Sequence, residues 1–327
     1  MAFKTSLDAR DAAAATLLAW YDRHRRDLPW RALPGEPADP YKVWLSEIML
    51  QQTRVGAVLE HYRTFLRQFP TVQKLAAAQE SWVLAAWSGL GYYRRARMMH
   101  AAAKVIVKEQ AGRFPASAEQ LSALPGIGRY TAAAIASIAF DEPTAVVDGN
   151  VKRVLRRLVA DNLSDELLWE TAQELLTQAR PGDFNQAMME LGATICLPRQ
   201  PRCSVCPVYE QCDSRGSLPK PKTLGRQNKR MIHYALDCHN GSVFLVRRPK
   251  DASLMPGMWE LPEIPGANGV SPWLTLRHSI TVTDYQVTVS QVPASDQSDG
   301  KWISKGRLAR LPLTGLARKI LRAAKLI

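Results

Sequence analysis

Long apolar runs are missing from this sequence, and acidic residues are few. No apolar stretch reaches the roughly 18 residues of a membrane-spanning helix, and the opening MAFKTSLDAR lacks the apolar core of a signal peptide. We therefore expect no membrane partner and a cytoplasmic location. Aspartate and glutamate total 30 against 43 lysines and arginines, so the formal net charge is +13. This charge favours a polyanionic partner, although it also fits a merely soluble basic protein.

Cysteine is scarce too, and its distribution is uneven. The chain has five cysteines, and four of them fall in one segment with the spacing C-x6-C-x2-C-x5-C, at Cys196, Cys203, Cys206 and Cys212. Four thiolates in one short loop can surround a single metal centre, which is either an iron–sulfur cluster or a structural zinc ion. Two disulfides are a weaker third alternative, because crowding of this kind favours metal in a reducing cytosol.

The alternating pattern of β-strands is absent from the first two thirds of the chain. Helical patterns fill it instead, over residues 8–26, 40–53, 55–69, 71–79, 81–88, 96–110, 117–123, 150–160, 164–179 and 184–195. The pattern of apolar residues changes after a basic stretch rich in proline and glycine. HYALDC and VFLVRR then predict a β-hairpin, in which the fifth cysteine, Cys238, falls in a strand and is expected to pack there. HSITVTDYQVTVSQV predicts a further strand, and Thr314 is a suitable cap for a last helix. We predict an all-α domain over 1–212, a linker over 213–230 and a small α+β domain over 231–327.

A glycine-rich turn, LPGIG at 124–128, opens onto one of these helices. Gly126 and Gly128 allow positive φ, and without side chains they leave the backbone amides accessible. A nest of such amides at a helix N-terminus binds anions, and DNA phosphate is the anion we expect. A plain helix-to-helix turn is the alternative.

Two carboxyl groups stand out against apolar surroundings. Glu47 follows Val43 and Trp44 by one helical turn, in a helix that Asp39 is expected to cap, so it falls on or beside the buried face. Burial disfavours its charged form, although an exposed helix glutamate is the usual case. Asp148 lies between an apolar run and a glycine, about twenty residues after the glycine-rich turn at 124–128.

A loop of glycines, aromatics and arginines, GLGYYRR at 89–95, suits contact with DNA. Its tyrosines could wedge between bases while its arginines hold phosphates. A tyrosine pair that closes a core explains the same residues about as well.

The chain resembles the helix-hairpin-helix DNA glycosylases of the endonuclease III superfamily. The resemblance lies in the glycine-rich turn at 124–128, which matches their hairpin, in Asp148 and in the spacing of the four cysteines. The resemblance implies one [4Fe–4S] cluster, held by the four cysteines of the loop 196–212 in a structural role. Members that also cut the strand carry a lysine nucleophile where this chain has Tyr130. We therefore expect base removal without efficient cleavage of the backbone.

Six motifs narrow the resemblance to the MutY family of adenine DNA glycosylases. They are LPWR at 28–31, YKVWLSE at 41–47, MLQQT at 49–53, GLGYY at 89–93, DGNV at 148–151 and FNQAM at 184–188. The implied partner is double-stranded DNA with adenine opposite 8-oxoguanine or guanine. A monomer fits an enzyme that kinks one DNA site, with replication or repair proteins as further partners. The implied fold is an all-α helix-hairpin-helix glycosylase domain with an iron–sulfur loop, plus a Nudix-like α+β C-terminal domain.

The resemblance also assigns roles. Glu47 matches the general acid that protonates adenine at N7, and Asp148 matches the carboxylate that stabilises or traps an oxocarbenium-like sugar. Asp148 is expected to stay ionised beside Asn150. The other matching positions are Tyr130 and Asn150 in the catalytic pocket; Arg26, Trp30, Arg31 and Gln186 around the flipped adenine; and Gln52, Thr53, Leu90, Tyr92, Gly126 and Gly128 against DNA.

The C-terminal domain departs from the family pattern. Where the family carries Phe-Ser-His to recognise 8-oxoguanine, this chain has Ile280-Thr281-Val282. Thr281 can supply the hydroxyl of the serine, but Val282 cannot act as a histidine. We therefore predict a weaker preference for 8-oxoguanine. No Arg-Glu-x-x-Glu-Glu metal box follows Gly257, so nucleotide hydrolysis is not expected.

Two other functions compete with adenine removal. A mismatch thymine glycosylase shares the tyrosine and the cysteine loop, but a thymine anion leaves without protonation at N7. A non-catalytic iron–sulfur protein that binds DNA structure would not require Glu47 and Asp148.

Overall fold

The computed structural model describes residues 7–33, 35–159, 163–217, 228–265, 271–280, 283–294 and 300–327. The chain divides into two compact units. Unit 1 comprises Met1–Tyr62, Thr71–Gln73 and Ala101–Pro221, and unit 2 comprises Arg63–Pro70, Lys74–His100 and Lys222–Ile327. Among the helices of the described ranges, none is both long and apolar enough to cross a bilayer.

The regular secondary structure of unit 1 is all helical among its described residues. Its elements are α1 (Leu7–His24), α2 (Pro40–Leu50), α7 (Ala118–Ser122), α8 (Arg129–Phe140), α9 (Gly149–Val159), α10 (Asp165–Leu175), α11 (Pro181–Thr194) and the short 3-10 turn η1 (Cys203–Val205). Three helices cross the division between the units: α3 (Val55–Gln68), α4 (Val72–Ala77) and α6 (Arg94–Glu109). The helical prediction for this part of the chain is confirmed, with ends that differ by a few residues.

Local sequence explains several helix starts. Asp39 accepts hydrogen bonds from the Tyr41 and Lys42 amides, with Pro40 at the first helical position, so the predicted cap of α2 is confirmed. Ser164 caps α10 in the same way through the Leu167 amide. One face of α9 is buried and the other carries basic residues, as its amphipathic sequence requires.

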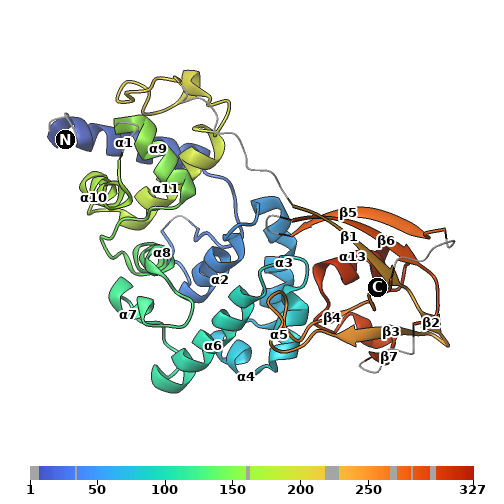
Figure 1. Cartoon of the computed structure of the whole chain (residues 1–327). Helices are drawn as coiled ribbons and strands as arrows, with labels where there is room; N and C mark the ends of the chain where they lie inside the picture. Colours follow the sequence, from blue (N-terminus) through green and yellow to red (C-terminus); the bar gives the residue numbers. More distant parts are fainter. Residues whose placement is uncertain are drawn as a thin grey trace. The chain divides into compact units, whose positions relative to one another are not determined.

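Helix α11 is the centre of unit 1. It contacts α1, α8 and α9, and Figure 1 shows it among these helices. Two of its glycines make this close packing possible. A Cβ at Gly182 would lie 2.4 Å from the Ser137 carbonyl oxygen, and a Cβ at Gly192 would lie 2.7 Å from the Cβ of Asn150. Both contacts fix α11 against the helices that carry the candidate site.

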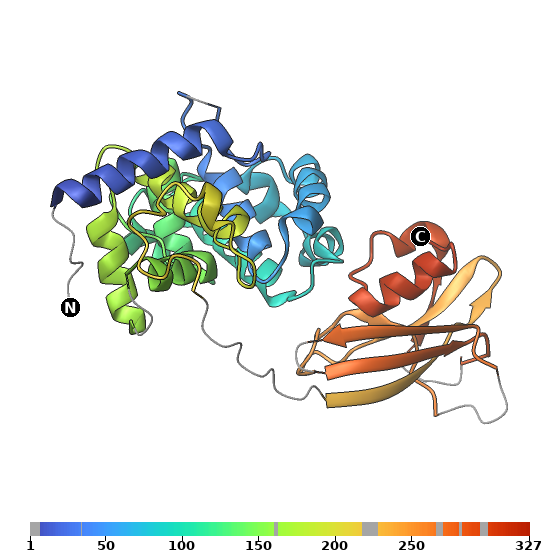
Figure 2. The ribbon, with the colours of Figure 1, turned by 90° about the horizontal axis from the view of Figure 1, so that it is seen from above.

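Unit 2 joins helix α5 (Glu80–Trp87) to a C-terminal domain that contains strands. The C-terminal elements are β1 (Asn228–Ala235), β2 (Cys238–His239), β3 (Ser242–Arg247), β4 (Trp259–Glu260), β5 (Leu274–Ile280), β6 (Thr283–Ser290), β7 (Gly300–Ser304), α12 (Lys305–Leu308) and α13 (Gly315–Ala323). One sheet has the order β1-β6-β5. In the other, β3 pairs with β2, β4 and β7. Residues of both sheets share one core with α13 (Figures 1 and 2).

The predicted hairpin is correct only at its tip. Cys238 and His239 pair with Val243 and Ser242, across a turn in which Asn240 and Gly241 both have positive φ. The preceding residues form β1, which pairs in parallel with β6 instead. The alternating pattern of β1 places Ile232 in the core whichever strand lies beside it, so the pattern did not identify the partner.

Two further expectations for this domain need correction. The single strand predicted over 278–292 is two strands, because β5 and β6 pair antiparallel from Leu274↔Val289 to Ile280↔Thr283. Cys238, expected to pack inside a strand, is exposed. Thr314 does cap α13 by accepting from the Ala317 amide, as predicted.

Candidate active site

Glu47 lies in the interior of unit 1. Its neighbours along α2, Val43, Trp44 and Ile48, are all buried, and Glu47 itself is 6% exposed. This confirms the prediction that the carboxyl falls on the buried face. Burial raises the pKa of Glu47 to about 7, against the charge of Arg31 and a hydrogen bond from Tyr130, both of which lower it. A carboxyl in this state can carry a proton near neutral pH.

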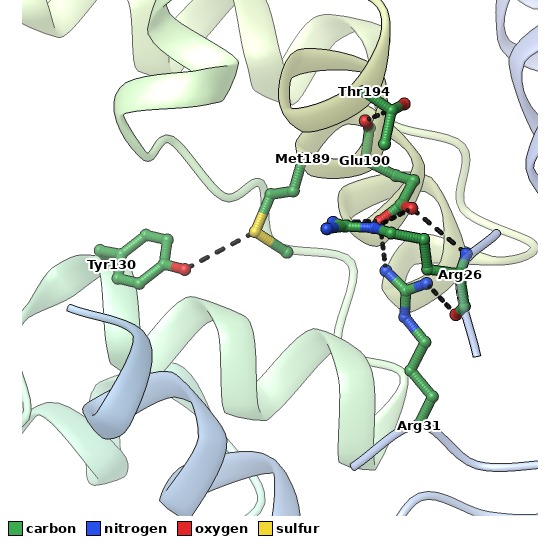
Figure 3. Close-up of polar contacts among 6 residues, drawn as sticks. All are labelled: Arg26, Arg31, Tyr130, Met189, Glu190 and Thr194. Carbon is green, nitrogen blue, oxygen red and sulfur yellow. Dashed lines mark hydrogen bonds and ion pairs between the residues drawn. The ribbon is translucent and has the colours of Figure 1, made fainter. Parts of the chain in front are cut away.

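Tyr130, in the first turn of α8, is the side chain that contacts Glu47. Its hydroxyl donates to Glu47 Oε2 at 2.5 Å and lies 3.6 Å from Met189 Sδ, a contact drawn in Figure 3. Burial raises the pKa of Tyr130 well above its ordinary value, and the carboxyl groups of Glu47 and Asp148 raise it further. The hydroxyl is therefore a fixed hydrogen-bond donor to the glutamate.

Asp148 precedes α9 and caps it. Its Oδ1 accepts from the Val151 amide at 2.7 Å, and its Oδ2 accepts from the Asn150 side chain at 3.0 Å. Burial raises the pKa of Asp148, and hydrogen bonds from Val151 and Asn150 oppose that rise. Burial is an influence that the sequence does not display, and the ionised state of Asp148 remains a prediction. The donors nevertheless all favour the carboxylate form.

An unbroken series of hydrogen bonds leads from Asp148 to the cysteine loop. Asn150 donates to Asp148 and accepts at Oδ1 from Arg153 Nη2, at 2.8 Å. Arg153 Nε donates in turn to the Cys196 carbonyl oxygen at 2.8 Å. The sequence analysis did not predict a site role for Arg153, because nothing in a basic helix face identifies which cation turns inward.

Arg26 and Arg31 converge on a residue that sequence reasoning missed, Glu190 of α11 (Figure 3). Arg26 donates to Glu190 Oε1 through Nε at 2.6 Å and to Oε2 through Nη2 at 2.9 Å. Arg31 donates to Oε2 through Nη2 at 2.8 Å. The signal was present in the sequence, because Glu190 interrupts an apolar stretch of α11 much as Glu47 interrupts that of α2.

The other two residues predicted around the base differ in exposure. Trp30 is 9% exposed and packs edge-on against Tyr62, with ring centroids 5.2 Å apart, which is the arrangement of a core residue. Gln186 and Arg31 both line a cavity of about 530 Å³, which also contains the ionic side chains of Arg25 and Asp183. Its lining does not include Glu47, Tyr130 or Asp148, so this cavity lies beside the two candidate carboxyl groups rather than around them.

The residues predicted to contact DNA lie in three turns, and each turn is described within its own unit. In unit 1, Gln52 is exposed with a left-handed φ of 56° and Thr53 is half-buried. In unit 2, Tyr92 is 48% exposed with a left-handed φ of 48°, while Leu90 and Tyr93 are buried. Non-glycine residues in this conformation are uncommon and gather at functional sites.

The tyrosine pair thus combines both alternatives, an exposed Tyr92 and a Tyr93 that closes a core. In the hairpin turn of unit 1, Gly126 has the expected positive φ of 75°. Gly128 does not: it is the N-cap of α8 with φ −92° and ψ 176°, an extended conformation open to most residues. Thr281 and Val282 lie outside the described residues.

The four cysteines of the loop are half-buried free thiols. Cys196, Cys206 and Cys212 pack against the core of unit 1. Among the residues that the structure describes, no three His, Cys, Asp or Glu side chains converge closely enough to hold a metal ion. The thiols are still near neighbours. Burial raises the pKa of Cys206 to about 11, and the charges of the other three act in the same direction.

This arrangement can deliver a proton from Glu47 and hold a negative charge at Asp148, in one helical unit with guanidinium and amide donors nearby. Those are the requirements for breaking a bond whose leaving group must be protonated while a cation develops on the other side. No lysine stands at the start of α8 to act as an amine nucleophile.

Comparison with known proteins agrees with this geometry. A profile of the HhH-GPD superfamily of base excision DNA repair proteins matches residues 45–178. Among solved structures, a thermostable thymine-DNA glycosylase has 31% sequence identity and a TM-score of 0.58, covering 64% of this chain and 97% of its own.

Curated relatives extend the match. The adenine DNA glycosylase of Mus musculus is 36% identical, over 96% of this chain and 78% of its own length. That of Homo sapiens is 48% identical over 66% of this chain, which amounts to 42% of the human protein. Because the mouse relative matches nearly the whole chain, the chain belongs to the adenine DNA glycosylase family of base-excision DNA repair enzymes.

Proposed function

We propose that this enzyme removes adenine opposite 8-oxoguanine or guanine in double-stranded DNA by hydrolysing the N-glycosidic bond. The observation that carries the proposal is the pairing of Glu47, whose pKa is about 7, with Asp148, whose carboxylate form is supported by hydrogen bonds. Two carboxyl groups in different protonation states are what acid-assisted glycosidic cleavage requires.

In the proposed reaction Glu47 gives its proton to N7 of adenine, which leaves as a neutral base. Positive charge then develops on the sugar, and the Asp148 carboxylate stabilises it or bonds to C1′ transiently. Water adds its oxygen to C1′, and one of its protons returns to Glu47. The products are free adenine and an abasic site in an intact strand. Asn150 keeps Asp148 ionised and oriented, and Tyr130 holds Glu47.

Adenine must flip out of the DNA double helix to reach Glu47. We assign Arg26, Arg31, Trp30 and Gln186 to the pocket that receives it, supported for the two arginines by their shared contact with Glu190. Gln52 and Tyr92 are proposed to fill the gap in the duplex, since both are exposed on strained turns. Thr53 and Leu90 are assigned to the side of the opposite base, and the turn with Gly126 and Gly128 to backbone phosphate.

We further propose that Cys196, Cys203, Cys206 and Cys212 hold one [4Fe–4S] cluster. The four thiols are near enough for their charges to affect one another, as the ligands of one centre with one thiolate per iron must be. The cluster would cross-link the loop 196–212 and present its basic residues to phosphate. Such thiols persist in the reducing cytoplasm, where we place the protein as a monomer. Replication or repair proteins are proposed as further partners.

The C-terminal sheets are proposed as a Nudix-like domain that recognises the opposite base, after a linker over 213–230. With Ile280-Thr281-Val282 in the recognition segment, we propose a weaker preference for 8-oxoguanine than the family pattern gives. Thr281 is the residue assigned to contact that base.

Thymine removal from T:G mismatches is the second candidate, because a solved relative is a thymine-DNA glycosylase at 31% identity. Glu47 argues against it, since thymine is a pyrimidine without the N7 atom that Glu47 is proposed to protonate. The curated relatives that match this chain at 36% and 48% identity are named as adenine glycosylases.

The test is a single-turnover assay on duplexes that hold A:8-oxoG, A:G, A:C or T:G, each analysed with and without alkali. We expect adenine release, with strand breaks only after alkali. The Glu47→Gln and Asp148→Asn variants should bind the duplexes yet lose about 100-fold or more in rate. Thymine release would shift the function to T:G repair. Binding without release of any base would leave a non-catalytic DNA-binding protein.

A further inference from the structure

The turn of unit 2 that carries Tyr92 has a strained backbone. Three of its residues have positive φ: Gly89 at 112°, Gly91 at 70° and Tyr92 at 48°. Tyr92 is 48% exposed, whereas Ser88 and Tyr93, which flank the turn, are each 3% exposed. A residue with a side chain keeps a left-handed conformation only when the structure around it holds the backbone there. The turn therefore depends on its buried flanks.

Both flanks are bound to one backbone atom of the C-terminal domain within unit 2, the carbonyl oxygen of Leu313. The Ser88 hydroxyl donates to this oxygen at 2.9 Å, and the Tyr93 hydroxyl donates to it at 3.0 Å. All three residues are buried, so water competes little for these hydrogen bonds. The segment 89–92 is therefore closed at both ends by the same atom.

Leu313 is itself held in place by strand β4. The Trp259 amide of β4 donates to the Pro312 carbonyl oxygen at 2.9 Å, and the Thr314 amide donates to the Trp259 carbonyl oxygen at 2.9 Å. Thr314 also caps α13. The acceptor of the two hydroxyls is thus fixed by a strand on one side and by a helix on the other.

Arg318 of α13 binds the same flank of the turn. Its Nε donates to Ser88 Oγ at 2.7 Å, and its Nη2 donates to the Ala85 carbonyl oxygen of α5 at 3.4 Å. Hydrogen bonds from a charged donor are stronger than those between neutral groups. Because Ser88 Oγ accepts from the guanidinium, its own proton is directed to the Leu313 carbonyl oxygen.

Contacts inside the turn connect these flanks to Tyr92. Trp87 Nε1 donates to the Gly91 carbonyl oxygen at 3.1 Å, and Arg95 Nη2 donates to the Leu90 and Gly91 carbonyl oxygens at 3.2 Å and 3.3 Å. The Arg95 guanidinium also lies over the Tyr92 ring, 5.5 Å from its centroid. The exposed ring therefore extends from a turn whose backbone is bonded on its inner side.

We propose that Ser88, Tyr93 and Arg318 are positioning residues. Together with the Leu313 carbonyl oxygen they form a clasp, by which the C-terminal domain holds Tyr92 ready to fill the gap in the duplex. The inference rests on the proposed function, in which Tyr92 has that role. It gives the C-terminal domain a task besides recognition of the opposite base, and this task serves A:8-oxoG and A:G duplexes alike.

The test measures the opening of the duplex by the whole chain. 2-Aminopurine is placed opposite thymine beside an A:G or A:8-oxoG mismatch, where its fluorescence rises when the neighbouring stack opens. The Asp148→Asn background keeps the adenine in the DNA. Tyr92→Ala should remove most of the fluorescence rise and weaken binding. Ser88→Ala should reduce the rise and weaken binding by about threefold to tenfold, as expected for one lost hydrogen bond, equally for both duplexes.

A double-mutant cycle tests whether the clasp acts through Tyr92. Because the clasp has no ring to hold in Tyr92→Ala, adding Ser88→Ala should weaken binding little further. Tyr93→Phe keeps the buried ring, loses one hydroxyl and should give part of the effect. Arg322→Met is the control for Arg318→Met, since both remove one charge from α13 and Arg322 is exposed. Only Arg318→Met should reduce the fluorescence rise.

If Tyr92→Ala lost opening and affinity while Ser88→Ala kept both, only this inference would be rejected. Losses from the two variants that add in full would also reject it, because the clasp would then be a merely structural contact. A changed ratio of A:8-oxoG to A:G affinity would assign Ser88 to base recognition instead and overturn the clasp.

Normal opening by Tyr92→Ala would overturn the role of Tyr92 and the clasp together. If the chain with Asp148 released no adenine from any duplex, the proposed reaction would fall, and the fluorescence cycle would still decide whether the clasp holds Tyr92.

Discussion

At the scale of single residues, the acid and base roles proposed for Glu47 and Asp148 rest on their hydrogen-bond donors rather than on their depth. Burial raises the pKa of both. Glu47 has one hydrogen-bond donor, the Tyr130 hydroxyl, whereas Asp148 is held by Val151 and Asn150, which together offer backbone and side-chain donors. In the proposed reaction this difference in donors makes Glu47 the acid and Asp148 the carboxylate.

Tyr130→Phe should extend activity toward higher pH. The hydroxyl donates to the carboxyl of Glu47 and lowers its pKa, so its removal raises that pKa above about 7. The alkaline limb of single-turnover adenine release should then move upward, even if the maximal rate drops. A limb that moves downward or stays in place would show that the tyrosine does not act on the acid.

Glu47→Gln should stabilise the fold selectively at alkaline pH. The folded-state pKa of Glu47 is about 7 against an ordinary value of 4.5, so the cost of ionising it appears as the pH rises above about 4.5 and is complete above about 7. Thermal unfolding should show the variant more stable than the wild type at pH 8, with the difference vanishing near pH 4. An equal difference at both pH values would contradict the burial argument.

Sequence reasoning succeeded where one residue and its near neighbours decide the outcome. The cap at Asp39 and the burial of Glu47 follow from residues within one turn of each. It failed where partners are far apart: Glu190 lies 164 residues from Arg26. The upward pKa of Asp148 was missed for the same reason, because desolvation is a property of the assembled unit.

At the scale of elements, the packing of α11 against α9 depends on one missing side chain. Gly192→Ala would place a Cβ 2.7 Å from the Cβ of Asn150 and 3.1 Å from its carbonyl group. We expect a loss of about 1–3 kcal/mol in the free energy of unfolding, measured by urea denaturation. Adenine release should fall more steeply than stability explains, because the clash moves the residue that supports Asp148.

A matched substitution controls for the added methyl group. Gly56→Ala lies in α3, where a Cβ meets nothing within 4 Å. It should stabilise the helix by up to about 1 kcal/mol and leave the rate unchanged. If Gly192→Ala behaved like Gly56→Ala, the close approach of α11 to Asn150 would have no functional weight.

The loop 196–212 allows a prediction on metal removal. Stripping iron with a chelator under oxidising conditions should lower the thermal midpoint, because Cys196, Cys206 and Cys212 pack on the core of unit 1. The pH limb set by Glu47 should stay in place in whatever activity remains. Iron and sulfide analysis before and after treatment is the measurement. A preparation that never contains either would contradict the proposed cluster.

At the scale of the whole molecule, the C-terminal domain shows which features the pattern of apolar residues does not predict. The alternation of apolar residues marked parts of β1, β3, β5 and β6, but β1 pairs in parallel with β6 across about fifty intervening residues. The division of the chain is also not linear, since Lys74–His100 belongs with the C-terminal residues. Local periodicity has no means to report either fact.

Val282→His should raise the preference for A:8-oxoG over A:G by several-fold in single-turnover assays. The substitution supplies the imidazole that the family pattern has in the segment Ile280-Thr281-Val282. The rate on A:G should change little, because Glu47 and Asp148 are untouched. Val282→Leu is the control for size. An unchanged ratio in the histidine variant would dissociate this segment from recognition of the opposite base.

The same interleaved division has a consequence for synthesis. A ribosome completes the residues of unit 1 by Pro221, but it makes Lys74–His100 of unit 2 more than a hundred residues before the strands that belong with them. The hydrogen bonds from Ser88 and Tyr93 of that early segment to the Leu313 carbonyl oxygen can form only after the last strand has emerged. Slow translation or early termination should therefore expose this stretch to chaperones and proteases while the helices of Asp148 and Glu190 are already folded.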